Sequence, residues 1–311
     1  MERVVVVGSL NMDLVAQVPS LPQRGQTIAE CDFQMLPGGK GANQAFAVGR
    51  LGGHIRMIGR VGEDPFGERL KSSLSSAGVD VSGVMSTPGE STGVALILVE
   101  TGGQNQIVVA AGANGRLSPD DVHSELRRAP GRYLLLQLES PLHTVAAAAK
   151  QGRLCGMSVI LDPAPAMPLS SSLLGNVDVL TPNESEALIL LGVRGDHISL
   201  DEAPAVCAKL LGLGPSCVIL KMGERGAWLA DSRQSRHFPA PRVEAVDTTA
   251  AGDTFNGALV TALAEGKLLE RAIGFANCAA AISVTRLGAQ PSVPSRREVE
   301  ETLAASGLAV G

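Results

Sequence analysis

Ala245-Val-Asp-Thr-Thr-Ala-Ala-Gly-Asp-Thr-Phe-Asn-Gly257 is the stretch from which the rest of the chain can be interpreted. An apolar, strand-like run reaches Val246, and a helical pattern opens at Asp253. Between them lie three residues with small or absent side chains, whose backbone N–H groups can approach a ligand closely: Ala250, Ala251 and Gly252. A helix N-terminus has unpaired N–H groups and a partial positive charge, which together favour an anion. The stretch therefore predicts an anion site with a carboxylate beside it.

Two interpretations of Asp253 are open at this point. It is either a first-turn acid that is favoured by the helix dipole, or the base of a phosphoryl transfer to a hydroxyl group. A second glycine-rich helix entry, Pro37-Gly-Gly-Lys-Gly-Ala-Asn-Gln44, favours the second interpretation. This entry is neither a P-loop nor a dinucleotide fingerprint, because it lacks the Gly-Lys-Ser/Thr of the first and the third glycine of the second. Two such entries far apart in the sequence are best explained as two sides of one site.

The composition agrees with an enzyme built on one large α/β domain or two small ones. The chain has 311 residues, a net charge of -5 and 45% hydrophobic residues, of which few are aromatic. The acidic balance argues against a nucleic-acid partner. The five cysteines form no Cys-x-x-Cys pair and are expected to be buried thiols in a reducing cytoplasm. We expect neither a signal peptide nor a membrane span, because no apolar run is long enough.

Strand and helix patterns alternate along most of the chain. Buried strands are predicted at Val4–Val7, Ile55–Ile58, Tyr133–Leu138, Ser158–Leu161, Val177–Leu180 and Cys217–Lys221, with a hairpin at Ala227–Phe238. Helices are predicted from Asn43, at Phe66–Ser76, Leu142–Gln151, Glu184–Leu191 and Ala203–Leu211, after Asp253, and at Leu269–Val284. Strands separated by helices of this length predict an α/β fold with a mostly parallel central sheet and helices on both faces.

Four segments do not follow this alternation. Leu14–Val18 and Thr27–Phe33 are short and half-polar, while Val94–Val99 and Gln106–Ala110 flank Glu100-Thr-Gly-Gly103 and predict a hairpin. We expect these segments to form a small β-sheet lid over the site. The chain is then a single domain of residues 1–311 with lid segments at about 12–37 and 92–113.

Eight motifs in order along the chain resemble the ribokinase-like (phosphofructokinase B) carbohydrate kinase family. They are Gly8-Ser-Leu-Asn-Met-Asp13, Pro37-Gly-Gly-Lys-Gly-Ala-Asn-Gln44, Glu90-Ser-Thr-Gly-Val-Ala95, Gln137-Leu-Glu-Ser140, Asp162-Pro-Ala-Pro165, Thr181-Pro-Asn-Glu-Ser-Glu186, Asp247-Thr-Thr-Ala-Ala-Gly-Asp253 and Gly288-Ala-Gln-Pro-Ser292. They cover nearly the whole chain. The second, fourth and eighth motifs are typical of the ribokinase branch, whereas Ala-Ala-Gly-Asp alone indicates only the wider family.

The resemblance implies that the chain transfers the γ-phosphate of ATP to the 5-hydroxyl of D-ribose. Asp253 would be the base, and the N–H groups of Ala250, Ala251, Gly252 and Asp253 would form the anion hole. The implied sugar-binding residues are Asn11, Met12, Asp13, Gly39, Lys40, Gly41, Ala42, Asn43, Glu139 and Asp253. Asp13 can accept hydrogen bonds from two neighbouring hydroxyls, and Asn43 can both donate and accept. Lys40 is expected to be an exposed loop lysine that contributes only its backbone N–H, as Gly39 does.

Without the resemblance, the same polar residues have simpler interpretations. Asn11 and Asp13 fit turn residues, and Glu139 fits a solvated acid at a strand end.

The resemblance also implies an ATP site made of Asn183, Lys221, Met222, Gly223, Glu224, Arg225, Gly226, Gly252, Asp253 and Asn277. Some ribokinases carry His at the position of Asn277, so its contact with the adenine base is left open.

Two metal sites and a dimer are implied in the same way. Asn183 and Glu186 would organise Mg²⁺, largely through water, although their spacing also fits a helix-capping pair. Oxygen atoms of six residues would bind K⁺: Asp247, Thr249, Ser283, Arg286, Gly288 and Ser292. The alternative for Asp247 is a loop carboxylate that nearby backbone amides satisfy. The resemblance also implies a homodimer that forms through the lid sheet.

Two alternatives to ribose phosphorylation remain. The nearer one is another sugar or nucleoside kinase of the same family, such as a deoxyribokinase or a fructokinase. The more distant one is a sugar-binding regulator without catalytic activity. The presence of Asp253, Asn183 and Glu186 disfavours a silent protein.

Overall fold

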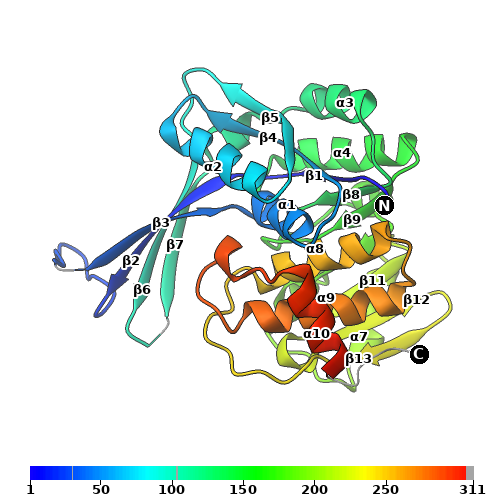
Figure 1. Cartoon of the computed structure of the whole chain (residues 1–311). Helices are drawn as coiled ribbons and strands as arrows, with labels where there is room; N and C mark the ends of the chain where they lie inside the picture. The colour runs from blue at the N-terminus through cyan, green and yellow to red at the C-terminus, as the bar shows by residue number, and fades with distance from the viewer. Residues whose placement is uncertain (30, 103, 306–311) are drawn as a thin grey trace.

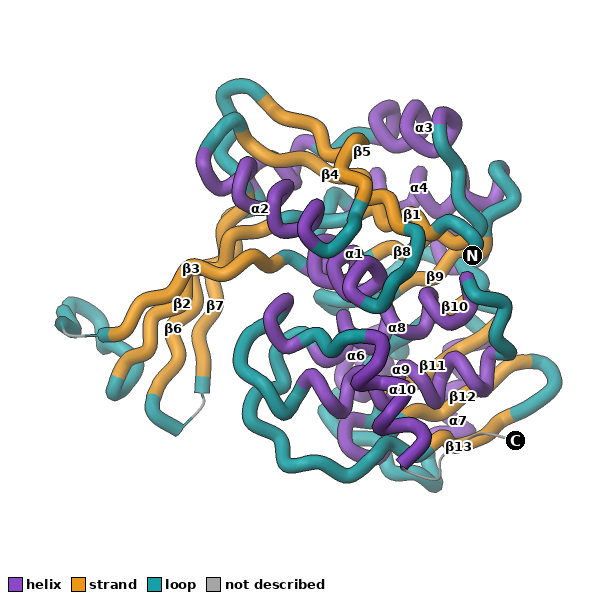
Figure 2. The backbone as a smooth tube through the Cα atoms, viewed as in Figure 1, coloured by secondary structure: helices purple, strands orange, loops and turns teal. Residues whose placement is uncertain are grey.

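The computed structural model describes residues 1–29, 31–102 and 104–305, and it contains two β-sheets. The larger sheet has nine strands in the order β13-β12-β11-β10-β9-β8-β1-β4-β5, and the smaller has four in the order β3-β2-β6-β7. Figure 1 shows the small sheet, with its strands β2, β3, β6 and β7, extending away from the body of the molecule. Figure 2 shows the larger sheet within layers of helices.

The larger sheet is parallel from β5 to β11 and ends in an antiparallel hairpin, as expected from the sequence. Its strands are β1 (Val4–Val7), β4 (Ile55–Gly62), β5 (Asp80–Thr87), β8 (Tyr133–Leu136), β9 (Ser158–Leu161), β10 (Val179–Leu180), β11 (Cys217–Lys221), β12 (Ala227–Asp231) and β13 (Ser235–Phe238). The strands of the smaller sheet are β2 (Asn11–Val18), β3 (Asp32–Gly38), β6 (Gly93–Glu100) and β7 (Asn105–Ala110).

Helices cover both faces of the larger sheet. They are α1 (Lys40–Arg50), α2 (Pro65–Ser76), α3 (Pro119–Arg128), α4 (Leu142–Leu154), α5 (Ser171–Leu174), α6 (Glu184–Leu190), α7 (Ala203–Leu211), α8 (Ala251–Ala264), α9 (Leu269–Ser283) and α10 (Arg296–Ala305), with 3-10 turns at Gly112–Arg116, Gly223–Arg225 and Gln290–Ser292. None of the helices in the described part of the chain could span a membrane.

Strand β1 explains why both faces are covered. Its four valines are all buried, and alternate side chains of a strand point to opposite faces. Val5 and Val7 pack in the core formed with α3, α4, α6 and α7, whereas Val4 and Val6 pack in the core formed with α1, α2 and α8. A continuous apolar run is typical of a parallel strand that is buried on both sides.

Helices α1 and α8, the two that begin at the glycine-rich motifs, pack directly against each other. A Cβ added at Gly257 of α8 would lie 2.5 Å from the Cβ of Ala47 in α1, so the missing side chain allows the close approach. Both helices begin near the carboxyl end of β1, where open parallel sheets bind their ligands. The packing therefore fixes the distance between the two predicted halves of the site.

The small sheet confirms the predicted hairpin. Strands β6 and β7 pair in an antiparallel register from Val94 opposite Ala110 to Val99 opposite Asn105. Residues 30 and 103 of the predicted lid segments lie outside the described residues. Every residue of β7 is exposed, including the apolar run Ile107-Val-Val109.

Several sequence-based expectations differ from the structure. The strand-like run to Val246 is wrong, because residues 239–250 contain no strand and Val246 is 60% exposed. Pro239 and Pro241 lie in this segment, and neither can donate to a sheet. Helices α1 and α8 begin at Lys40 and Ala251, earlier than the expected Asn43 and Asp253. Elements β5, α3, α5 and α10 were not predicted at all.

Candidate active site

Asp253 lies in the first turn of α8 and joins the two glycine-rich helix starts. Asp253 is 5% exposed. Oδ1 accepts a hydrogen bond from Gln44 Nε2 at 2.9 Å, and Oδ2 accepts one from Asn43 Nδ2 at 3.1 Å. Burial raises the pKa of Asp253, as does the nearby Asp162, while Lys40 and the two amide donors oppose the rise. The donors from α1 can hold the carboxylate in place but cannot take its proton.

The loop before α8, which was predicted to be an anion cradle, has an unusual backbone conformation. Ala250 has a positive φ of 57°, which is uncommon for a residue with a side chain. The N–H of Ala251 donates to the carbonyl of Thr248 at 3.2 Å, so it is less available than expected. No partner is found among the described residues for the N–H groups of Gly252 and Asp253. The cradle thus offers fewer free donors than the four residues assigned to it from the sequence.

Two predicted sugar-binding side chains, Glu139 and Asp13, lie on the same side of the site as Asp253. Glu139 Oε2 accepts hydrogen bonds from Ser9 Oγ at 2.6 Å and from the Lys40 N–H at 3.0 Å. Asp13 is near both Glu139 and Asp253, and burial together with these two negative charges raises its pKa to about 7. The structure thus collects several acids at one edge of the sheet, as the resemblance implies.

The glycine-rich loop at the start of α1 is tightly built. Gly39 has a φ of 86°, and a Cβ there would lie 2.7 Å from the backbone nitrogen of Asn11. The N–H groups of Gly41 and Ala42 donate to Ser9, at 3.4 Å to Oγ and 2.9 Å to the carbonyl. The expectation that the Lys40 N–H is free for a ligand is therefore wrong in this structure, because that group donates to Glu139.

Two further predicted sugar-binding residues serve the structure with their side chains. Met12 is fully buried and packs in the core beside α1 and α2. Asn11 is also buried, and its Oδ1 accepts a hydrogen bond from Asn114 Nδ2 at 2.8 Å.

The side chain of Lys40 was expected to be exposed, and this is wrong. It is half-buried at the first turn of α1 and lines a cavity of about 410 Å³. The negative charge of Asp253 raises the pKa of Lys40, and Asp162, Glu139 and Glu186 add to the effect. Its ammonium group is therefore part of the charge pattern of the site.

Asp162 and Lys221 form a buried ion pair that the sequence analysis did not assign. Asp162 is 2% exposed, and its Oδ1 accepts a hydrogen bond from Lys221 Nζ at 2.8 Å. Lys221 Nζ also lies 3.3 Å from the position that a Cβ of Gly252 would occupy, so it is beside the cradle. Two signals in the sequence pointed to Asp162: it opens the motif Asp162-Pro-Ala-Pro165, and it follows a buried strand at the sheet edge where ligands bind.

Asn183 and Glu186 form a helix-capping pair at the start of α6. Glu186 N donates to Asn183 Oδ1 at 2.8 Å, and Asn183 N donates to Glu186 Oε2 at 2.7 Å. Both residues also line the cavity that contains Lys40 and Asp253. Within residues 1–29, 31–102 and 104–305, no group of three or more His, Cys, Asp or Glu could hold a metal ion. The hydrogen bonds match the helix-capping alternative, and the assignment of the pair to Mg²⁺ stays a prediction.

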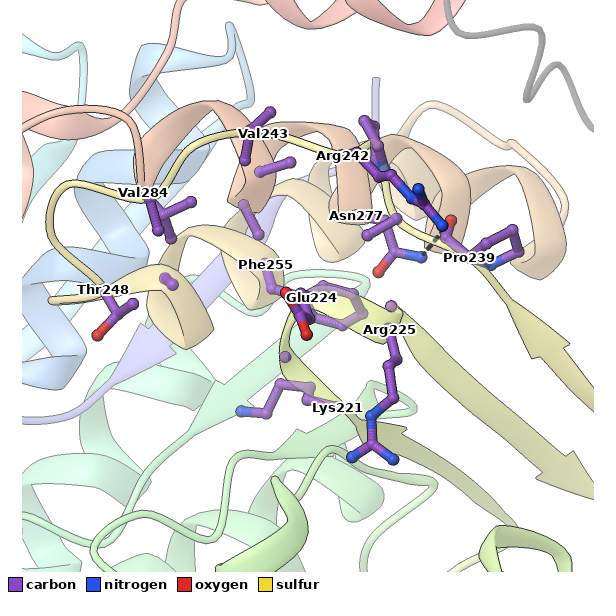
Figure 3. A pocket seen from close by; sticks show the side chains of 18 of the residues that line it. Lys221, Glu224, Arg225, Pro239, Arg242, Val243, Thr248, Phe255, Asn277 and Val284 are labelled. Atoms are coloured by element: carbon purple, nitrogen blue, oxygen red, sulfur yellow. Dashed lines mark hydrogen bonds between the residues drawn. The ribbon is translucent and has the colours of Figure 1, made fainter. Parts of the chain in front are cut away.

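A second, larger cavity of about 860 Å³ lies between the turn after β11 and helices α8 and α9 (Figure 3). Gly226 in this turn has a φ of 92°, and a Cβ there would meet the carbonyl oxygen of Phe238 at 2.1 Å. Arg225 donates from its guanidinium to the carbonyl of Ile198 at 2.8 Å and to Glu184 at 2.5 Å, and Met222 is buried. The turn therefore approaches the cavity chiefly through its backbone.

Asn277 of α9 faces the same cavity with its oxygen. Its Nδ2 donates to the carbonyls of Phe238 at 2.9 Å and Pro239 at 3.3 Å, and carbonyl oxygens can only accept. The amide orientation is therefore fixed, and Figure 3 shows Oδ1 pointing away from Pro239 into the pocket.

The two segments of the predicted potassium site also meet. Asp247 Oδ1 accepts from Thr249 N at 2.9 Å, and Oδ2 accepts from Gly288 N at 2.8 Å. Burial opposes ionisation of Asp247, but these hydrogen bonds outweigh it and lower its pKa.

Three predicted potassium ligands use their side chains in other contacts. Ser283 Oγ donates to Ala280 O, and Ser292 Oγ donates to Ala289 O. The guanidinium of Arg286 pairs with Glu298. The geometry of Asp247 matches the carboxylate satisfied by backbone amides.

Comparison with known proteins points to one family. Residues 1–296 match the family described as pfkB family carbohydrate kinase. The chain is 43% identical over 305 residues to a ribokinase of Haemophilus influenzae, with 97% of this chain and 98% of that protein covered. It is 37% identical over 304 residues to a deoxyribokinase of Salmonella typhimurium, with 96% and 98% covered.

Solved structures agree over the whole length. A ribokinase from Thermotoga maritima superposes with a TM-score of 0.89 at 38% identity, covering 98% of this chain and all of that one. An Arabidopsis thaliana ribokinase, solved in complex with ribose and ATP, has a TM-score of 0.89 at 35% identity, with 97% and 98% covered.

Proposed function

Because the chain belongs to the pfkB family of carbohydrate kinases, we propose that it phosphorylates D-ribose at the 5-hydroxyl, giving D-ribose 5-phosphate and ADP. The observation that carries this proposal is the position of Asp253. Its carboxylate lies between the acids of the sugar side and the cradle at the start of α8, held by donors that cannot accept its proton. A base beside an anion site is the arrangement that phosphoryl transfer to a hydroxyl requires.

In the proposed reaction, the 5-hydroxyl oxygen of ribose attacks the γ-phosphorus of ATP. Asp253 accepts the hydroxyl proton, and the bond between the γ-phosphorus and the bridging oxygen breaks as ADP leaves. The N–H groups of Gly252 and Asp253, with the ammonium groups of Lys40 and Lys221 nearby, stabilise the charge on the transferred group. Since the transition state is loose, positioning and charge stabilisation contribute more than the basicity of Asp253.

Sugar recognition is assigned to the acids and amides beside α1. Asp13 and Glu139 accept hydrogen bonds from ribose hydroxyls, and Asn43 reaches the hydroxyl nearest to Asp253. The main chains of Asn11, Met12, Gly39, Gly41 and Ala42 are assigned to the same side of the sugar site. The second candidate substrate is 2-deoxyribose, because a deoxyribokinase is among the similar proteins.

ATP is assigned to the larger cavity, with Mg²⁺ at its junction with the smaller one. The backbone from Lys221 to Gly226 lies along the adenosine, and Asn277 Oδ1 faces the base. When bound, Mg²⁺ would neutralise charge on the β- and γ-phosphates. Glu186, whose pKa is raised mainly by burial, and Asn183 would hold waters of that ion and not the ion itself.

A potassium ion is proposed behind the cradle, held by oxygens of Asp247, Thr249, Ser283, Arg286, Gly288 and Ser292. The hydrogen bond from Gly288 N to Asp247 supports this, because it brings the two segments together at the loop that carries Ala250. For Arg286 only the carbonyl is available, since its guanidinium pairs with Glu298. The ion would order the cradle without touching the substrate.

The chain is proposed to act as a cytoplasmic homodimer of one-domain subunits. The exposed apolar run Ile107-Val-Val109 on the edge strand β7 supports a dimer contact through the small sheet. Segments 12–37 and 92–113, which contain that sheet, would form the lid over the sugar.

A sugar panel with ATP and Mg²⁺ tests the proposed reaction. ADP release would be measured with D-ribose, 2-deoxyribose, fructose and a nucleoside, and the phosphorylated position would be read by NMR. We expect the highest kcat/KM for D-ribose and phosphate on O5, with Asp253→Asn as the inactive control. A higher kcat/KM for 2-deoxyribose or fructose would reassign the substrate, and no ADP release with any sugar would contradict a kinase.

A further inference from the structure

A row of buried polar side chains lies behind Asp253. Gln137 Nε2 donates to Gln44 Oε1 at 2.6 Å. Gln44 Nε2 donates to Asp253 Oδ1 at 2.9 Å and to Asp162 Oδ2 at 2.8 Å. Lys221 Nζ donates to Asp162 Oδ1 at 2.8 Å. Gln44, Gln137 and Asp162 are 0%, 1% and 2% exposed, so water does not compete for these bonds.

The amide of Gln44 can adopt only one orientation in this row. Its two carboxylate partners, on Asp253 and Asp162, can only accept when ionised, so they require the nitrogen of Gln44. Both hydrogens of that nitrogen are then used, one for each carboxylate. Gln137 fixes the remaining oxygen. Gln44 is therefore a single neutral donor group placed between two buried acids.

We propose that Gln44 is a positioning residue for phosphoryl transfer. It holds the Asp253 carboxylate in the orientation needed for the reaction, and it connects Asp253 through Asp162 to Lys221, which lies beside the anion cradle. The proposal rests on the proposed function. A lysine ammonium has three hydrogens, and Lys221 uses one of them on Asp162. Because Nζ lies beside Gly252, the others can reach a phosphate in the cradle. One chain of side chains thus joins the phosphate site to the base.

Loss of the Gln44 donor should affect Asp253 more than it affects binding. Asn43 alone would then hold the Asp253 carboxylate, on one oxygen. The charged groups that face Asp253 are Lys40 from α1, Asp162 after β9, Lys221 from β11 and Asp13 from β2. Without the amide between them, the two carboxylates of Asp162 and Asp253 repel each other directly, which favours the protonated, inactive form of the base.

The test is Gln44→Met, which keeps the length of the side chain and removes both donors. Because a hydrogen bond to a charged group is stronger than one between neutral groups, we expect kcat to fall about 10- to 100-fold. KM for ribose and ATP should change less than about threefold, because Gln44 contacts neither in the proposed complex. The acid limb of the kcat profile should move to higher pH.

Two further variants separate positioning from folding. Gln151→Met removes another buried glutamine amide, on α4 and away from the site, and should leave kcat and the acid limb unchanged. Gln137→Met removes only the group that fixes the Gln44 oxygen, so it should lower kcat less than Gln44→Met does. Thermal unfolding would identify any variant that fails to fold. If Gln44→Met does not fold, Gln137→Met is used for the same measurements.

An unmoved acid limb with normal kcat in Gln44→Met would overturn the proposal, as would a loss confined to KM. If Gln44→Met does not fold, the same result in Gln137→Met overturns it. A readout without turnover keeps this separate from the proposed function. Infrared titration of the wild type, with Asp253→Asn subtracted, follows the Asp253 carboxyl directly. Its midpoint should rise in Gln44→Met even if no sugar is phosphorylated, and an unchanged midpoint would refute the inference.

Discussion

Lowering the pH should weaken D-ribose binding, because Asp13 loses its charge near neutral pH. Burial and the negative charges of Glu139 and Asp253 raise the pKa of Asp13 to about 7 in the ligand-free protein. The ionised carboxylate can accept hydrogen bonds from two neighbouring ribose hydroxyls, whereas the protonated form has lost part of that capacity. Since the raised pKa favours the protonated form below neutrality, affinity should increase as the pH rises.

The size of the effect follows from the ionised fraction of Asp13. With a pKa of about 7, about a tenth of the side chains are ionised at about pH 6 and about nine tenths at about pH 8. The apparent dissociation constant for ribose equals the intrinsic constant divided by the ionised fraction of Asp13. It should therefore fall about tenfold from about pH 6 to about pH 8. At about pH 7, binding should release about half a proton for each ribose bound.

Calorimetry in two buffers with different ionisation enthalpies measures both quantities. Ribose is titrated into the protein without ATP, so that no turnover occurs. The difference between the two observed enthalpies gives the number of protons released, and the pH series gives the affinity. Asp13→Asn should bind ribose more weakly and should lose both the pH dependence and the proton release.

Two results would refute this reasoning. Affinity that stays constant between about pH 6 and about pH 8 would mean that Asp13 does not meet the hydroxyls as a carboxylate. Proton release that persists in Asp13→Asn would assign the titration to another group, with Asp253 the first candidate because burial raises its pKa as well.

Four further outcomes are expected. Asp253→Asn should keep ribose affinity and lower kcat about 10²- to 10⁴-fold in steady-state assays, and a near-normal kcat would remove its role as base. Asn277→Ala should reduce the kcat/KM preference for ATP over GTP by up to about tenfold. The reason is that Asn277 Oδ1 can accept a hydrogen bond from the 6-amino group of adenine but not from the 6-oxo group of guanine. An unchanged ratio of the two kcat/KM values would speak against that contact. Turnover should rise with K⁺ at ionic strength matched by a bulky organic cation, and Asp247→Ala should abolish the response; equal rates with and without K⁺ would exclude the ion. Gly39→Ala should raise the ribose KM and lower the free energy of unfolding by about 1–3 kcal/mol. Gly52→Ala should lower it less, because Gly52 has a similar φ but open space around it. Equal losses in the two variants would contradict the steric argument.

The parts of the fold that could be predicted are those whose sequence pattern is set by burial. Strands β1 and β11 are continuous apolar runs because both of their faces are covered. Strand β5 was missed because it is an edge strand with mixed polar and apolar residues. Helix α3 was missed because only Val122 and Leu126 mark its buried side, although Ser118 caps it.

The candidate site could be predicted where the backbone imposes a residue type. Gly39 has a positive φ and lies where a side chain would meet the backbone of Asn11, and such a glycine is visible in a sequence. The partners of Gln44 and Asp162 were not predictable, because their hydrogen bonds join positions far apart in the chain. The raised pKa of Lys40 likewise depends on acids contributed by other segments.

The contact between Gly257 and Ala47 limits how this protein can be recombined with its relatives. Helices α1 and α8 come from opposite ends of the sequence, yet a single methyl group at position 257 would separate them. A chimera that takes its first half from one kinase and its second half from another must therefore match this pair. A similar constraint exists at Gly93, the first residue of β6, where a Cβ would lie 2.2 Å from Asn114 Nδ2 and 2.3 Å from Asn11 Oδ1, so an exchanged β6 strand must keep this glycine.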